Sequence, residues 1–386
     1  MRTMVGSSIL PNGFDAGVEI AKNSTKGLKT PVLGFLFTSE LYDHAEVLNG
    51  IKSVTPGIKI IGCTSSGAVM TPDGIISSAD GYGAMMVLDD NELCVGVASA
   101  PRGTDPRMTG RKLAKEALDD AGKKFAPYAF AMFATPGEEE DYLKGIQDVI
   151  GEIPMFGGTC SDNNLSGEWK VFDSENVQTD GCAVVFFYTN KDIKNVIDGT
   201  YNETESIGII TETDNNRMIK TIDGEPSLEK YASWIGEEVE NIKGTKILTA
   251  SVAHPLGLKT LDGEMTIVRH PLVGNEEGTI SLGADVSSKT AVMLLESDED
   301  GLIGGAVQTV KQVLSNFQAS GLLLIHSSER KNYIGERIDE DFVAIKNAVG
   351  DIPFIVAFTL AEYGQKDHSG AKINNLSLSF TGFSEN

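Results

Sequence analysis

The chain has 386 residues, more than the about 250–300 at which a single hydrophobic core stops growing, so we expect at least two domains. Its hydrophobic fraction of 41% is typical of a globular protein and excludes wholesale disorder. Lys and Arg number 32 against 55 for Asp and Glu. The resulting net charge of −23 repels nucleic acid and anionic lipid, so we expect neither as a partner.

The N-terminal segment 1–17 lacks the apolar core of a signal peptide, and no apolar run approaches the about 18–20 residues that cross a bilayer. The sequence therefore predicts a cytoplasmic protein without membrane insertion. The 4 cysteines include no CxxC pair, so they indicate neither a disulfide framework nor a zinc site.

The first expected unit opens with a helix at 14–28 and a buried apolar strand at 31–40. Apolar residues with helical spacing then predict a second helix at 42–54. Two more apolar runs, at 57–64 and 81–88, predict strands.

A second unit repeats this order. Helical spacing predicts a helix at 105–122, followed by a strand at 127–138. An amphipathic helix opened by acidic residues is expected at 138–152, and strands at 153–163 and 180–188.

Between this unit and the C-terminal region lies a different segment, residues 205–298. It contains a predicted helix at 227–244, and its alternating pattern and turn signals favour antiparallel hairpins. The short strands expected in it are 245–252, 264–273 and 278–286.

The third, more diverged unit lies near the C-terminus. It is expected to comprise a helix at 301–321, a strand at 320–329, a helix at 337–351, and strands at 352–362 and 374–383.

The common order of elements indicates an internal repeat. Phe37 lies 25 residues before Gly62, and Phe133 lies 24 residues before Gly157. Such units are too long for a solenoid and predict an α/β fold of mixed α+β character, in which repeated αβαββ units form helix-covered mixed sheets.

Gly224 and Pro226 punctuate the chain before the segment with the hairpins. We therefore expect two domains. Residues 1–224 would hold two repeat units, and residues 225–386 the β-rich segment and the third unit.

Small polar residues follow the strands of the first two units. Glycines at 62, 157 and 158 let a backbone or a ligand come close, and small ligands bind beyond strand ends in open α/β sheets. The alternative is a strand that turns sharply in a crowded core. The candidate ligand-binding residues at these ends are Cys63, Thr64, Ser65, Ser66, Thr159, Cys160, Ser161 and Asp162.

Charged residues near the strand ends of the third unit are further candidates, because a buried charge must be paired or used. Arg330 and Glu362 could hold a ligand with both an amine and a carboxylate, or they could form a plain salt bridge. Arg269 is a candidate of the same kind.

Catalysis has weaker support. Cys63 or Cys160 could serve as the nucleophile of a hydrolase or transferase in the same cleft, but no histidine falls in a local catalytic signature. His254 and His270 precede prolines and are typical of packed loops rather than metal ligands. The sequence lacks phosphate, dinucleotide and metal motifs, so we predict no cofactor and no metal. A scaffold that contacts proteins through its acidic surface stays a third alternative.

Several motifs together resemble the FIST sensory domain. Its N-terminal half is suggested by "LGFLFTSELYDHAEVLNGIKS", "IIGCTSSGAV" and "PMFGGTCSD". Its C-terminal half is suggested by "AHPLGL", "TIVRHPLV", "LLLIHSSERKNYIG" and "FTLAEYGQ", in that order. The resemblance covers residues 30–380.

This resemblance implies a ligand-binding input module of signal transduction, with small molecules such as amino acids as ligands. Many relatives are fused to output domains, whereas we expect here a free-standing sensor that signals through a protein partner or by oligomerising. Within the motifs, the resemblance favours Thr64, Ser65, Arg330 and Glu362 as ligand contacts.

Overall fold

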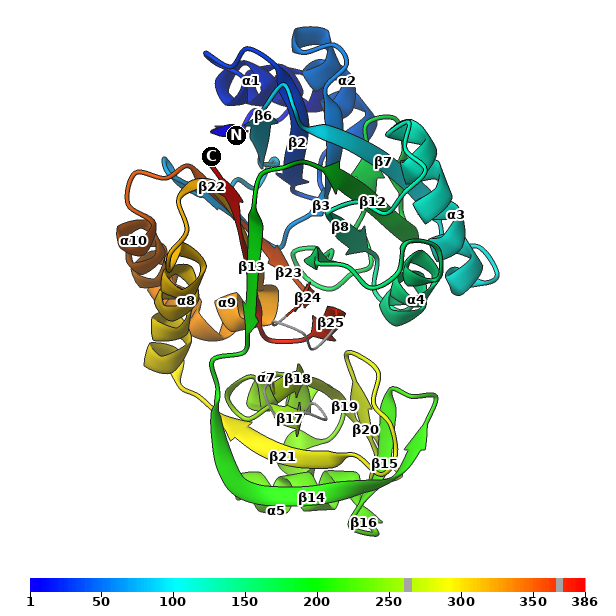
Figure 1. The fold of residues 1–386 in the computed structure, drawn as a ribbon. Coiled ribbons are helices and arrows are strands. Elements are labelled where there is room, and N and C mark those ends of the chain that lie inside the picture. The colour runs from blue at the N-terminus through cyan, green and yellow to red at the C-terminus, as the bar shows by residue number, and fades with distance from the viewer. Residues whose placement is uncertain (260–265, 366–370, 386) are drawn as a thin grey trace.

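The computed structural model describes residues 1–259, 266–365 and 371–385. Figure 1 shows an upper body of three sheets with helices on their outer faces, and a lower part built around a further sheet. The chain enters the lower part through residues 199–201 and returns through 297–298. The molecule is thus a mixed α/β protein of two parts with several mixed sheets.

The first upper sheet has the order β1-β6-β2-β3-β10-β11. β2 and β3 are parallel, and the other neighbours are antiparallel. Its strands are β1 (Arg2–Ser8), β6 (Gly83–Asp89), β2 (Pro31–Thr38), β3 (Lys59–Thr64), β10 (Val171–Asp173) and β11 (Val177–Gln178), and its helices are α1 (Gly13–Ser24) and α2 (His44–Val54).

The second upper sheet has the order β7-β12-β8-β9-β24-β25, with β8 and β9 parallel. Its strands are β7 (Cys94–Pro101), β12 (Gly181–Tyr188), β8 (Ala129–Ala134), β9 (Met155–Thr159), β24 (Ala361–Gln365) and β25 (Ala371–Asn374), and its helices are α3 (Pro106–Asp120) and α4 (Glu139–Ile150).

The third upper sheet has the order β13-β26-β22-β23-β4-β5, with β22 and β23 parallel. Its strands are β13 (Ile193–Asp198), β26 (Leu378–Ser384), β22 (Ala319–Ser327), β23 (Phe354–Thr359), β4 (Val69–Thr71) and β5 (Gly74–Ile76). The helices near it are α8 (Glu299–Leu314), α9 (Ser328–Ile334) and α10 (Ile338–Val349), with a short 3₁₀ turn at Gly335–Arg337 between the last two.

The three upper sheets share one strand pattern, and each is completed by a hairpin from elsewhere in the chain. β10–β11 extends the first sheet, β24–β25 the second and β4–β5 the third. The three hairpins cover sheet edges that would otherwise be open to pairing with other chains. They also bring the ends of β3, β9 and β23 together.

Four phenylalanines form the centre of the upper body. Phe35 comes from the first sheet, Phe156 and Phe187 from the second, and Phe383 from the third. Every pair among them has ring centroids 5.6–6.3 Å apart, and all four are fully buried. These spacings are those of attractive aromatic pairs, so this cluster holds the three sheets against one another.

The lower part has the strand order β18-β17-β21-β14-β15-β20-β19, and β16 pairs with β15 across the predicted boundary at 224/225. Its strands are β14 (Asn202–Asp214), β15 (Met218–Ile222), β16 (Glu225–Pro226), β17 (Leu256–Lys259), β18 (Thr266–Arg269), β19 (Pro271–Gly274), β20 (Ile280–Leu282) and β21 (Ala291–Glu296). Its helices are α5 (Ser227–Ile235), α6 (Val239–Ile242) and α7 (Lys246–Ala253).

Three local predictions are wrong. Residues 245–252 do not form a strand: Lys246–Ala253 is helix α7, which buries Ile247 and Val252, because tertiary packing overrides the strand preference of its β-branched residues. The predicted helix 227–244 breaks at Gly236, whose φ of 73° ends α5. The predicted helix 301–321 already ends at Leu314.

The strand predicted at 264–273 is divided into β18 and β19, and its first residues, 264 and 265, lie outside the described residues. Between the strand and the helix predicted for the third unit lies a further helix, α9, which the sequence did not predict. Within the described ranges, no helix is both long enough and apolar enough to cross a membrane.

Candidate functional site

The strand ends of the three upper sheets meet and bond to one another. The main-chain N–H of Phe358 donates to Ser65 Oγ at 2.9 Å, and Ser65 Oγ donates to the Ala68 carbonyl at 2.7 Å. The Ser161 N–H donates to the Thr64 carbonyl at 3.3 Å. The three strand ends therefore lie together, but their polar groups mainly satisfy each other.

The glycines at these ends serve strand packing. A Cβ on Gly62 would clash with the carbonyl oxygen of Leu36, and one on Gly157 with that of Met132. Both glycines therefore permit close approach of a neighbouring strand rather than of a ligand. The crowded-core alternative applies at these two positions.

The thiols of Cys63, Cys160 and Cys182 are fully buried. Burial raises the pKa of each thiol, and the nearby Cys63 raises that of Cys160 further. A nucleophilic cysteine needs a lowered pKa and access to substrate. Neither condition holds for these three residues, so the environment disfavours the predicted alternative of a cysteine-dependent enzyme.

We expect a thiol-specific chromogenic reagent to modify at most Cys94, the half-buried cysteine, in the native protein, and all 4 thiols after denaturation. The C94S variant should show no native-state labelling. Rapid native labelling of Cys63 or Cys160 would contradict this expectation and favour the enzyme alternative.

Arg330 is fully buried and bonds to the segment that enters the lower part and to the first turn of α8, which follows the segment that returns from it. Its Nη1 donates to the Gly199 carbonyl at 2.6 Å, and its Nη2 donates to Thr200 Oγ1 at 3.2 Å. Nη2 also donates to the Leu302 carbonyl at 2.9 Å, at the start of α8. The Arg330 guanidinium thus holds the chain where it passes between the two parts, and its donors are used by protein groups rather than by a ligand.

Glu362 and Arg269 are also satisfied within the protein. Glu362 accepts from the Ser377 N–H at 2.8 Å, and burial raises its pKa well above the usual range. Arg269 donates to the carbonyls of Asp285 at 2.7 Å and Ile373 at 2.9 Å, and burial lowers its pKa to about 10. No ion pair joins Arg330 to Glu362 among the described contacts.

A cleft lies between the upper body and the lower part. It consists of two pockets of about 300 Å³ and 310 Å³, which share Leu165, Leu248 and Glu329. We call them the apolar pocket and the polar pocket. Each has a volume at the low end of the range for small-molecule sites, about 300–1,000 Å³.

The apolar pocket has leucine and tryptophan walls with a few polar groups. Its lining from the upper body is Pro136, Gly137, Glu139, Thr159, Leu165, Trp169, Glu329, Leu360, Ala361 and Asn375, and from the lower part Arg217, Leu248, His270, Leu272, Leu282 and Gly283. His270 is buried with its Nε2 3.0 Å from the Leu248 carbonyl, and burial lowers its pKa to about 4.

The polar pocket is lined by Ser66, Asp162, Asn163, Asn164, Leu165, Glu329, Asn332 and Tyr333 from the upper body, and by Leu248, Thr249 and Val252 from α7. The Asp162 carboxylate accepts from the N–H groups of Ser166, Gly167 and Glu168 at 2.8–3.2 Å. Asp162 therefore shapes the loop that forms one wall of the cleft.

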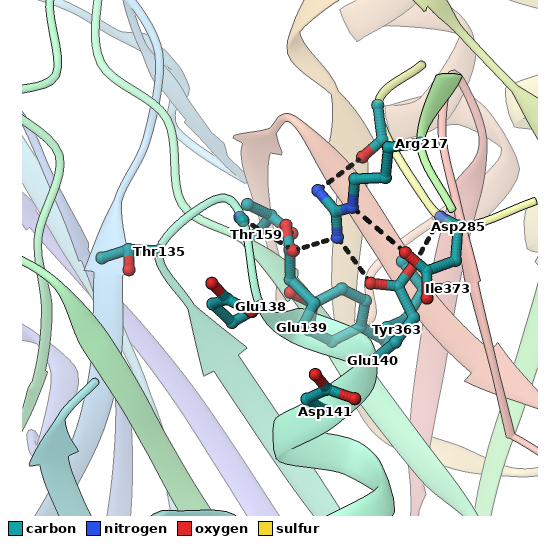
Figure 2. A network of polar contacts seen from close by, with 12 residues as sticks. Thr135, Glu138, Glu139, Glu140, Asp141, Thr159, Arg217, Asp285, Tyr363 and Ile373 are labelled. Atoms are coloured by element: carbon teal, nitrogen blue, oxygen red, sulfur yellow. Dashed lines mark hydrogen bonds and ion pairs between the residues drawn. The ribbon is translucent and has the colours of Figure 1, made fainter. Parts of the chain in front are cut away.

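Arg217 lines the apolar pocket and joins the two parts. Figure 2 shows its side chain pointing toward Glu139, Glu140 and Asp285. Arg217 precedes β15, after a turn in which Asn215 and Asn216 have φ of 51° and 55°. Its Nη2 donates to Glu139 at 2.7 Å and to Glu140 at 2.5 Å, both on the first turn of α4. One guanidinium of the lower part thus pairs with two carboxylates of the upper body.

Within the lower part, Asp285 lies 3.3 Å from Arg217 Nε. The network extends into the upper body, where Thr159 donates to Glu139 at 3.1 Å and contacts the Tyr363 hydroxyl at 2.6 Å. Burial raises the pKa of Glu139, while Arg217 opposes that shift. Burial alone would lower the pKa of Arg217, but Glu139 and Glu140 raise it overall.

Comparison with known families is decisive for the class of protein. The FIST N domain model matches residues 32–225, and the FIST C domain model matches residues 227–365. The chain belongs to the FIST family. FIST domains are sensory domains of signal transduction. No curated protein matches the sequence.

Solved structures show only distant likeness to this FIST chain. A cyanuric acid hydrolase is 8% identical, with 99% of each chain covered and a TM-score of 0.35. Phosphoribosylformylglycinamidine synthase II from Thermotoga maritima is 9% identical, with 99% of this chain and 72% of that chain covered and a TM-score of 0.23. Neither TM-score supports the transfer of an activity from these proteins to this chain.

Of the predicted site residues of this FIST chain, Ser66, Thr159 and Asp162 line the cleft. The linings of the two pockets do not include the other predicted residues: Cys63, Thr64, Ser65, Cys160, Ser161, Arg269, Arg330 and Glu362.

Sequence reasoning missed four residues of the cleft: Glu139, Arg217, Glu329 and Trp169. The acidic residues that open α4 are a local signal, but such residues are equally typical of an ordinary helix start. Nothing in the sequence relates Arg217 to Glu139, since the contact spans 78 residues.

Proposed function

We propose that this FIST chain is a sensory protein that binds a small metabolite, an amino acid or a compound of similar size, in the cleft and performs no catalysis of its own. The observation that carries the proposal is that the cleft is lined by both parts of the molecule. A ligand there contacts the upper body and the lower part at once. It can therefore favour one arrangement of the two parts over another.

The composition of the cleft supports the same function. Small-molecule sites are mostly apolar, with a few polar groups that orient the ligand. Leu165, Trp169 and Leu248 supply apolar surface, whereas Glu329 and Asn375 supply polar groups. A ligand-dependent arrangement of the two parts would be passed to a signalling protein partner in the cytoplasm.

Ligand binding should change the fluorescence of Trp169, which lines the apolar pocket. We expect amino acids or related metabolites to alter the emission of the wild-type protein with saturation. The signal should largely disappear in W169F, because Trp234 lies on α5 and outside the lining of the cleft.

Thermal denaturation provides an independent measurement. A ligand present at about 100 times its Kd stabilises the folded state by about 2.7 kcal/mol, and W169F should still show this effect. A broad metabolite panel that changes neither fluorescence nor melting temperature would contradict the proposed function.

A further inference from the structure

The charges that line the cleft differ in how fully they are already bound. Three carboxylates line it, on Glu139, Asp162 and Glu329. Glu139 accepts from Arg217, Thr159 and the Gly137 N–H at 2.7–3.1 Å. Asp162 accepts from three main-chain N–H groups and the Ser166 hydroxyl. These two carboxylates therefore have little capacity for a ligand.

Glu329 is different. It lines both pockets and is 7% exposed, and its described hydrogen bond is a long one, 3.4 Å from Asn332 Nδ2. Burial raises the pKa of its carboxyl group, and the hydrogen bond from Asn332 and the charge of Lys331 oppose this shift. A carboxylate that is buried in a pocket with one long hydrogen bond is incompletely satisfied, because a buried charge requires a partner.

The neighbouring lysine does not supply that partner. Lys331 Nζ donates to the Ser66 carbonyl at 2.7 Å and lies 5.2 Å from the ring centroid of Phe358. Among the described contacts, no ion pair joins Lys331 to Glu329. The place beside the Glu329 carboxylate is thus open to a cation from the ligand.

Anionic ligand groups meet the opposite situation. Arg217 is the cationic side chain in the described linings of the two pockets. Its three nitrogens donate to Glu139, Glu140, Asp285 and the Gly283 carbonyl. A ligand carboxylate or phosphate would have to displace one of these acceptors.

We propose that the ligand is a primary amine with an apolar body, whose ammonium group donates to Glu329 while the apolar body lies against Leu165, Trp169 and Leu248. This inference rests on the proposed function and narrows its ligand class from amino acids and similar metabolites to cationic amines. An ammonium group offers three donors and a charge, so it satisfies a buried carboxylate better than a neutral hydroxyl does.

The test compares ligands that differ in one group. Phenethylamine is titrated beside 2-phenylethanol and phenylalanine, and isoamylamine beside 3-methylbutanol and leucine, by calorimetry and thermal denaturation. In the wild type, each amine is expected to bind at least about 10-fold more tightly than its alcohol, since hydrogen bonds to charged groups contribute about 1.5–3 kcal/mol. The parent amino acid should bind no more tightly than the amine.

The E329Q variant tests the assigned residue, because glutamine keeps the size of the side chain and removes its charge. Amine affinity should fall about 10- to 100-fold, to the level of the alcohol. The matched control is E336Q, a change at an exposed glutamate of the 3₁₀ turn that follows α9, which should bind like the wild type. The ratio of amine affinity to alcohol affinity is measured on the wild type alone, so it tests the inference even if E329Q misfolds.

The outcomes separate this inference from the proposed function. If amines bind and a folded E329Q still prefers them over alcohols, the inference is overturned and the proposed function stands. If amino acids bind about 10-fold more tightly than their amines, the cleft contains a group that binds the carboxylate of the ligand, and the inference is likewise overturned. If amines, alcohols and amino acids all fail to bind the wild type, this result contradicts the inference, and failure of the full metabolite panel then contradicts the proposed function.

Discussion

Replacing Arg217 by methionine is expected to lower the free energy of unfolding by about 3 kcal/mol. The variant leaves Glu139, which is 1% exposed, as a buried carboxylate without its cation. Removing one partner of a buried ion pair typically costs about 3–5 kcal/mol. We expect the lower end because the Arg217 side chain keeps 23% of its exposure. Urea denaturation of both proteins measures the difference.

Two further variants show whether burial of Glu139 causes the stability loss expected for R217M. Arg337 also contacts three carboxylates, those of Glu299, Asp300 and Glu340, but at the surface, so R337M should change the urea midpoint much less. Adding E139Q to R217M should restore part of the lost stability, because glutamine carries no charge to bury. Equal losses in R217M and R337M would show that burial does not set the cost.

The second large effect is expected at the centre of the upper body, where F156A should lower the free energy of unfolding by about 3–5 kcal/mol. Phe156 contacts the aromatic rings of Phe35 and Phe383, which belong to the other two sheets, and that of Phe187 in its own sheet. Truncation would therefore leave a cavity where three sheets meet. Denaturant titration monitored by circular dichroism checks this value.

The control for this variant is F125A. Phe125 is 64% exposed and contacts Tyr188 at the rim, so its removal should cost only a small fraction of the F156A effect. Comparable losses at the two positions would mean that the phenylalanine cluster does not hold the sheets together.

The Arg217 network also bears on how a ligand could act. Arg217 and Asp285 belong to the lower part, and Glu139 and Glu140 to α4 of the upper body. The Asp285 N–H donates to Glu140 at 2.9 Å, a second bond between the two parts. These contacts lie at the edge of the apolar pocket, so a ligand that displaces or strengthens them changes the coupling between the parts.

Helix positions were largely predictable because their signals are local. The apolar spacing of residues 42–54 predicts α2, and Asp43 caps it by accepting from the N–H groups of Ala45 and Glu46. The acidic residues before α8 act similarly, since Asp298 accepts from the Gly301 N–H. Such patterns depend on residues within one or two turns of each other.

The helix α7 shows where local reasoning fails. Thr245, Thr249 and Val252 favour a strand, yet the segment buries Ile247 and Val252 as a helix beside β19. Strand preference is a weak property that depends on the surface a segment covers, and that surface is absent from the local sequence.

By itself, the sequence determined the class of protein and the order of most helices and strands. Only the tertiary structure decided which hairpin completes each sheet. It also placed Arg330 against the connection at residues 199–201, and Glu329 in the cleft with an incompletely bound carboxylate. The physical reason is range: periodicity and caps act between near neighbours, whereas burial and hydrogen-bond saturation depend on partners far away in the chain.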